Sequence, residues 1–387
     1  MNNTKNPLIL PTTIISIKNF LTNSVIFFLP IYFANIGFSG FQIGIILSVF
    51  AVTSLLSSVL IGLFSDRYPV KYLSIISFML LTVYTFGLST SKNFWIILLL
   101  FTLGGLGNNI SNISLTSFVL KLIKRKNAKR KLGIFNSTIQ VISGIGALVG
   151  GLFIAKTNFT NIFLTLSILF LITTIFSFFI KKIDTFKYSI EHYKGDLWKK
   201  EIIYFIIIIF IFTLHWGAEG TSYALLLKNN FKLSQTSLSL YLGSMWILYG
   251  FLIYFVSRFS KKQVFTSKIL YTGLILSGLG HIAFVYPTVF YSYTLRLVHE
   301  LGDAILFMFI YLGIHFHFPS ERIGGTSGAI LTITVLGRFV GSFIFGPIGD
   351  IYGYQYPFII SGILTLLCLI VAVKYTQLVK LTTRWQP

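Results

Sequence analysis

Long apolar runs, separated by short polar segments, repeat along the chain from residue 12 to residue 379. A bilayer-spanning helix needs about 20 consecutive apolar residues, and most runs reach that length. Only helices fit, because backbone polar groups in hydrocarbon must be satisfied within the segment. The pattern predicts an all-α integral membrane protein with twelve transmembrane helices, at roughly 12–36, 41–65, 72–90, 93–120, 132–156, 160–180, 202–227, 234–257, 266–286, 288–316, 323–349 and 354–377.

Basic residues fall mostly in alternate loops of this topology, with 24 on one side and four on the other. Loops rich in Lys and Arg stay in the cytoplasm, which predicts cytoplasmic N and C termini in a multi-pass protein of the cytoplasmic (inner) membrane. The net charge of +21 lies almost entirely in these loops. It is therefore expected to meet anionic membrane lipids, and no nucleic-acid partner is predicted.

The longest polar interruption, residues 181–201, lies near the midpoint of the chain. It predicts an N-terminal six-helix bundle at 1–180, a cytoplasmic linker at 181–201 and a C-terminal six-helix bundle at 202–387. Parallel repeats of six spans build some transporters. Three residues of the fifth and sixth predicted spans recur at an offset of 195 in the eleventh and twelfth, namely Gly146, Gly151 and Phe163 as Gly341, Gly346 and Phe358.

Composition removes other classes. The chain is 55% hydrophobic and 11% charged, whereas soluble domains carry about a quarter charged residues. Its one cysteine, Cys368, lies in an apolar run, so no disulfide framework is expected. No Gly-rich phosphate loop and no Ser/His/Asp or metal-ligand pattern is found in the sequence. We therefore predict no enzyme, no cofactor and no metal site.

At the end of the second predicted span stands Gly62-Leu-Phe-Ser-Asp66-Arg67-Tyr-Pro69-Val70-Lys71. This segment resembles the signature of the major facilitator superfamily, in which a Gly and three residues precede Asp-Arg and then a Gly and basic residues. Gly62, Asp66, Arg67 and Lys71 match the signature, and Pro69 stands where the signature has Gly. A Gly allows close helix contact, and the acid can pair with basic groups across the bundle as a conformational latch. A plain charged turn is the alternative.

The resemblance implies a secondary active transporter with two bundles around a central cavity and alternating access by rocking of the halves. It also implies that the first, fourth, seventh and tenth helices line the cavity. Some antiporters of the superfamily end the fifth helix with Gly-Pro-x-x-Gly-Gly. The corresponding segment here, residues 146–151, has no Pro, which weakens an assignment as an exporter without excluding it.

Ionisable residues inside apolar runs are functional candidates, because each costs about 2.5–3.5 kcal/mol on insertion scales. The C-terminal half concentrates them. The tenth predicted span carries four of them, at spacings of three and four residues that place all four on one helix face, namely Arg296, His299, Glu300 and Asp303. This arrangement is similar to that of the lactose permease class. We predict proton coupling by Glu300 first, then Glu219, Asp303 and His299, and substrate binding by Arg296, Arg338, His215 and Trp216. The alternative is a set of permanently paired charges that dock helices.

The N-terminal half carries amides instead. Asn19, Asn23, Asn108, Asn112 and Gln140 are predicted to bind substrate, with hydrogen bonds between neighbouring helices as the alternative. Lys18 is the one charge within the spans of this half. It lies near the inner end and could extend to the interface, so its role stays open.

Together these features predict a monomeric, proton-coupled secondary transporter of a small polar or anionic solute, with sodium still open as the coupling ion. The alternative is a drug/proton antiporter, because an aromatic cavity also accepts lipophilic cations, and a Glu219 without an Arg partner would favour it. A lipid flippase or a non-transporting membrane receptor is a more distant alternative. The sequence does not predict the identity of the solute, the direction of transport or the stoichiometry.

Overall fold

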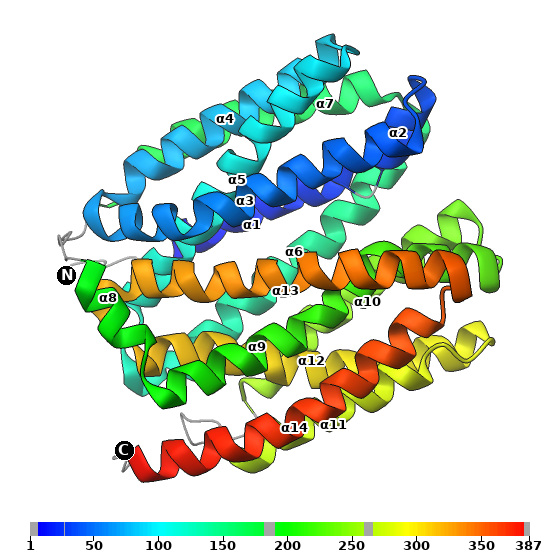
Figure 1. Ribbon diagram of the computed structural model, residues 1–387. Helices are drawn as coiled ribbons and strands as arrows, with labels where there is room; N and C mark the ends of the chain where they lie inside the picture. The colour runs from blue at the N-terminus through cyan, green and yellow to red at the C-terminus, as the bar shows by residue number, and fades with distance from the viewer. Residues whose placement is uncertain (1–6, 27, 182–189, 259–265, 383–387) are drawn as a thin grey trace. The chain divides into compact units, whose positions relative to one another are not determined.

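The computed structural model describes residues 7–26, 28–181, 190–258 and 266–382, and within these ranges every regular element is a helix (Figure 1). The α-helices are α1 (Ile9–Ile26), α2 (Leu29–Asn35), α3 (Gly40–Arg67), α4 (Val70–Thr90), α5 (Phe94–Leu122), α6 (Ala128–Lys156), α7 (Phe159–Ser177), α8 (Ile190–Leu197), α9 (Lys200–Ala218), α10 (Gln235–Val256), α11 (Ser267–Ala283), α12 (Val289–His317), α13 (Ile323–Tyr352) and α14 (Tyr356–Thr382). Two π-helical turns, η2 (Glu219–Tyr223) and η3 (Leu226–Asn230), follow α9. The predicted all-α membrane class is confirmed.

Ten helices of the described ranges are long and apolar enough to cross a bilayer. The predicted spans 12–36 and 266–286 correspond to α1 with α2 and to α11, which are not among these ten. The count of twelve spans therefore remains a prediction, as does the cytoplasmic placement of both termini. Residues 1–6 and 383–387, and residues 182–189 of the predicted linker, lie outside the described ranges.

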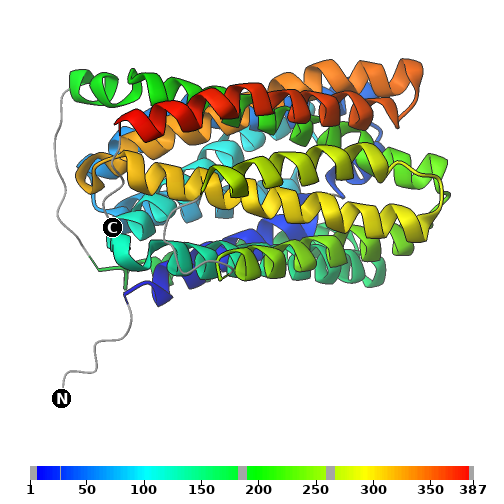
Figure 2. The same ribbon diagram turned by 90° about the horizontal axis from the view of Figure 1, so that it is seen from below.

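The chain forms two compact units. Unit 1 comprises Met1–Ile123, Thr138–Lys187 and Ser320–Leu331, and unit 2 comprises Lys124–Ser137, Tyr188–Pro319 and Thr332–Pro387. In unit 1, α4 packs against α5 and α7, and α1 packs against the same two helices (Figure 1). In unit 2, α12 packs against α10 and α11, and α14 against α9 and α11; Figure 2 shows α11 and α12 side by side. The predicted division at 180 and 201 stays a prediction.

Side-chain caps fix where several helices begin. The Ser39 hydroxyl accepts a hydrogen bond from the Gln42 amide, and the Gln42 side chain accepts one from the Ser39 amide. This capping box satisfies two donors that the first turn of α3 would leave unpaired. Asn93, Asn158 and Ser234 cap α5, α7 and α10 through one acceptor oxygen each.

The glycines of the internal repeat lie at equivalent helix crossings. A Cβ at Gly146 would overlap the carbonyl oxygen of Phe20 on α1, within unit 1. A Cβ at Gly341 would overlap the carbonyl oxygen of Leu214 on α9, within unit 2. Each half thus uses a glycine at the same place in the repeat to let two backbones approach, which is what small residues do between membrane helices.

Two glycines of α13 make a matched pair for testing this close approach. Gly341→Ala forces a methyl group into backbone, which costs about 1–3 kcal/mol, whereas the nearest atom to a Cβ at Gly346 is 3.7 Å away. We expect Gly341→Ala to lower the melting temperature of the purified protein in detergent and Gly346→Ala to leave it unchanged or raise it. Equal melting temperatures for the two variants would contradict the crossing described above.

Candidate functional site

The polar centre of unit 2 is built by three helices and a π-helical turn. Arg296, His299, Glu300 and Asp303 lie buried on α12, spaced so that they share one face. α9 supplies His215 and Trp216 and continues into η2, whose first residue is Glu219. π-helical turns inside longer helices are rare, and those that do occur are often found at functional sites. These elements bring together side chains that lie far apart in the chain, such as His215 and Asp303, which are 88 residues apart.

Arg296 lies between two carboxylates. Its Nη2 atom is 2.5 Å from Glu219 Oε1 and 2.7 Å from Glu300 Oε1, and its Nε donates to Glu300 Oε1 at 2.8 Å. The guanidinium also lies over two rings, 4.6 Å from the centre of Tyr223 and 5.1 Å from that of Phe284. Aromatic faces stabilise a cation, so the rings and both carboxylates hold Arg296 in one place.

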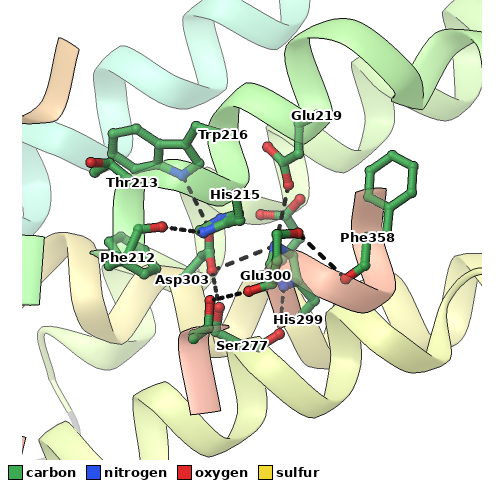
Figure 3. A network of polar contacts seen from close by, with 12 residues as sticks. Phe212, Thr213, His215, Trp216, Glu219, Ser277, His299, Glu300, Asp303 and Phe358 are labelled. Atoms are coloured by element: carbon green, nitrogen blue, oxygen red, sulfur yellow. Dashed lines mark hydrogen bonds and ion pairs between the residues drawn. The ribbon is translucent and has the colours of Figure 1, made fainter. Parts of the chain in front are cut away.

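Asp303 contacts three polar side chains on two neighbouring elements (Figure 3). His215 Nε2 lies 2.9 Å from Asp303 Oδ2, and Trp216 Nε1 donates to the same oxygen at 3.3 Å. The Ser277 hydroxyl on α11 donates to Asp303 Oδ1 at 2.7 Å. Asp303 therefore ties α12 to both α9 and α11.

Two histidines present the same ring nitrogen to carboxylates. Nδ1 of His299 lies 2.8 Å from the carbonyl oxygen of Ser277, and Nδ1 of His215 lies 2.5 Å from that of Phe212. A carbonyl accepts only, so each Nδ1 carries a hydrogen. His299 Nε2 faces Glu219 Oε1 at 3.2 Å and Asp303 Oδ1 at 3.5 Å. A neutral ring would thus point a lone pair at carboxylate oxygens, and a proton or another cation must relieve that repulsion.

A third histidine closes the cluster. The ring centre of His281, on α11, lies 4.4 Å from that of His299 and 5.0 Å from that of His215. Both ring nitrogens of His281 are buried without a hydrogen-bond partner among the described residues. Of the three carboxylates, that of Glu219 is the most accessible, at 21% exposed against 6% for Glu300 and 5% for Asp303.

The polar centre of unit 1 surrounds Lys18. Its ammonium donates to the side-chain oxygens of Asn19, Asn108 and Asn112 at 3.2, 3.0 and 2.6 Å. Lys18 is 1% exposed, so the alternative that it extends to the interface is wrong. Asn23 donates to the backbone oxygen of Asn19. The network joins α1 to α5, as the interhelical alternative expects, and a solute contact by these amides stays a proposal.

The signature segment makes its own contacts within unit 1. Asp66 is fully buried, pairs with Lys121 at 2.8 Å, and accepts from the backbone amides of Gly324 and Gly325 at 2.9 and 2.7 Å. Those amides open α13, where a helix N-terminus favours an anion. A Cβ at Gly62 would lie 2.8 Å from the Gly324 oxygen, so this glycine permits the approach of α3 to α13.

The two basic residues that match the signature, Arg67 and Lys71, have different surroundings from Asp66. The ammonium of Lys71 lies 5.4 Å from the ring centre of Phe178. Arg67 ends α3. Asp66 pairs with Lys121 of α5, a residue that the signature does not contain. A latch role for the four signature residues stays a proposal.

Two predicted site residues do not join these networks within the described part of the chain. Arg338 is exposed on α13, and its Nη2 atom would lie 3.5 Å from a Cβ at Gly220. Gln140 is half-buried on α6. Sequence reasoning missed His281, Ser277 and Lys121. His281 stands in an apolar run and could have been found by the rule that selected His215; Ser277 and Lys121 gave no such signal.

Comparison with known proteins agrees with this architecture. The family profile described as Major Facilitator Superfamily matches residues 13–216 and again 202–385. The quinolone resistance protein NorA of Staphylococcus aureus (strain MSSA476) is 23% identical over 342 residues, which cover 84% of this chain and 85% of that protein.

Two solved structures have the same fold. The human organic anion transporter MFSD10 (TETRAN) aligns with a TM-score of 0.77 at 15% identity, over 96% of this chain and 100% of that one. The proton:xylose symporter XylE aligns with a TM-score of 0.72 at 13% identity, over 95% and 96%. At such low identity these two likenesses concern the fold alone.

Proposed function

This chain belongs to the major facilitator superfamily, and from that premise we propose that it is a proton-coupled secondary active transporter of the cell membrane. It moves a small polar or anionic solute by alternating access. The family and fold are those of transporters, not of enzymes. The observation that carries proton coupling is the sharing of one guanidinium by two carboxylates, those of the half-buried Glu219 and the buried Glu300.

One cation cannot neutralise two carboxylates at close range, and a proton on either of them removes the excess charge. Glu219 is the more accessible of the two and exchanges that proton with water, while Glu300 keeps Arg296 in place. His299 contacts Glu219 and Asp303 and relays between them. In this proposal Arg296, His215 and Trp216 orient the site, and Arg338 is an anchor for an anionic group of the solute. In unit 1, the proposed solute contacts are Asn19, Asn23, Asn108, Asn112 and Gln140.

Neutral variants test the coupling in proteoliposomes. We expect Glu219→Gln and Glu300→Gln to abolish accumulation driven by a pH gradient and to retain exchange of labelled for unlabelled solute, because exchange needs no net proton movement. Asp350→Asn is the matched control, since Asp350 is an exposed carboxylate of unit 2 that bonds Tyr354. Uphill transport by both Gln variants at the parent's rate would refute the assignment. Accumulation driven by a sodium gradient alone would make sodium, rather than the proton, the coupling ion.

Drug/proton antiport is the second candidate, favoured by the similarity to the quinolone resistance protein NorA. The Arg partner of Glu219 argues against it, because an unpaired carboxylate suits a lipophilic cation better. A thermal-shift screen separates the two, since a ligand that binds the folded state raises its stability. Stabilisation by organic acids or sugars supports the metabolite proposal, and stabilisation by lipophilic cations alone supports drug efflux.

A further inference from the structure

The side chains of the coupling site carry more negative than positive charge. Glu219, Glu300 and Asp303 face one guanidinium, that of Arg296. Arg338 of α13 lies close to Gly220, the residue after Glu219. A buried excess of negative charge is costly. A divalent cation offsets it as well as protons do, and nitrogen and oxygen ligands for such an ion are present.

The ligand atoms converge. One atom each from His215, Glu219 and His299 lie within 4.8 Å of one another. A four-coordinate transition-metal ion with ligand bonds of 2.0–2.2 Å separates neighbouring ligand atoms by about 3.4 Å. His299 Nε2 lies 3.2 Å from Glu219 Oε1 and 3.5 Å from Asp303 Oδ1. The distance from His299 to Glu219 already matches one edge of a coordination polyhedron, and the widest separation among the three converging atoms must close by about 1.4 Å on binding.

Second contacts orient both imidazoles as metal-binding histidines are oriented. A histidine ligand usually donates its other ring N–H to a carbonyl or carboxylate, which leaves the remaining nitrogen free for the metal. His299 does so to Ser277 and His215 to Phe212. Asp303 is held in turn by the Ser277 hydroxyl and the Trp216 indole. His299 Nε2 is also buried, and no described residue forms a hydrogen bond with it, so its lone pair is available.

We propose that His215, Glu219 and His299 bind one divalent transition-metal ion, with Asp303 beside both histidines. Imidazole together with carboxylate suits ions such as Zn²⁺ and Co²⁺, whereas Mg²⁺ and Ca²⁺ prefer oxygen alone. Glu219 then shares its carboxylate between the ion and Arg296. His281 and Glu300 adjoin the site and complete its charged surroundings. The inference departs from the absence of metal predicted from the sequence, and it concerns the proposed coupling site without requiring proton coupling.

Direct binding of metal to the tag-free full chain tests this site. Protein purified in detergent and treated with a chelator is dialysed against Co²⁺ and, separately, against Zn²⁺, with excess Mg²⁺ present. We expect one bound ion per chain and visible absorption typical of Co²⁺ with nitrogen and oxygen ligands. His299→Gln should weaken binding by at least about tenfold, since even the loss of a supporting contact costs 10–100-fold. His215→Gln/His299→Gln should bind no ion.

His317→Gln is the matched control. His317 lies on the same helix as His299, but its Nε2 bonds the Tyr375 hydroxyl, so its loss should leave the affinity unchanged. Glu219→Gln provides a second ligand variant at the most accessible position, should the histidine variants melt below the parent. The inference is overturned if the parent binds no stoichiometric ion, or if the double histidine variant binds Co²⁺ as the parent does. Transport driven by a pH gradient without metal binding overturns this inference alone, and metal binding without such transport overturns only the proposed proton coupling.

Discussion

Arg296→Gln should destabilise the folded protein by about 3–5 kcal/mol, the usual cost of removing one partner of a buried ion pair. Arg296 is 4% exposed and is the guanidinium that contacts both Glu219 and Glu300. Glutamine cannot supply the charge, and it also gives up the contacts with Tyr223 and Phe284. The measurement is thermal unfolding of parent and variant, purified in the same detergent.

Two comparisons make this result specific. Arg258→Gln removes an arginine that also lies over a ring, that of Tyr254, but at an exposed position, and it should melt close to the parent. Arg296→Gln/Glu300→Gln removes a carboxylate together with its partner, so its loss of stability should be smaller than the sum of the two single losses. If Arg296→Gln melts like the parent, the two carboxylates are not charged in the folded protein.

The recurrence and length of the apolar runs predicted much of the helical fold. The predicted spans 41–65, 72–90 and 93–120 correspond to α3, α4 and α5 within a few residues. Two departures from the predicted spans are local. The predicted first span corresponds to two helices, α1 and α2, and Pro30 lies in the first turn of α2, where its missing N–H leaves no donor unpaired. The seventh span extends past α9 as the π-helical turns η2 and η3, for which the sequence has no periodic signal.

The sequence identified the site residues through the high free energy of placing ionisable side chains in a membrane. Their partners could be identified only once the packing of the helices was known. An ionisable side chain in an apolar run is a functional candidate whatever its orientation. This criterion selected Arg296, Glu300 and Glu219. Ser277 donates to Asp303 because α11 packs against α12 at that level. Serines are common in all these helices, so no property of Ser277 alone marks it as a partner. The rotation of one helix against another decides such contacts.

Asp66→Asn should weaken the tie between α3 and the start of α13 and shift the balance of conformations. The carboxylate pairs with Lys121 and accepts from the backbone amides of Gly324 and Gly325. Hydrogen bonds to a charged group are worth about 1.5–3 kcal/mol, which corresponds to about 10–100-fold in an equilibrium constant. If this contact breaks and forms during alternating access, the variant should populate the conformation described above less and transport more slowly by a comparable factor.

Transport rate and melting temperature, measured on the same variants, separate a latch from a purely structural contact. Lys71→Gln is the control within the signature, because Lys71 contacts the Phe178 ring rather than Asp66, and it should transport at the parent's rate. Asp66→Asn/Lys121→Gln removes both charges and should recover part of the loss in melting temperature, because the ammonium of Lys121 is removed together with the carboxylate that it pairs with. The transport defect should persist in that double variant, because the two amides of α13 still lack their carboxylate. A defect that disappears together with the loss of stability would mean that Asp66 holds the fold and does not latch a conformation.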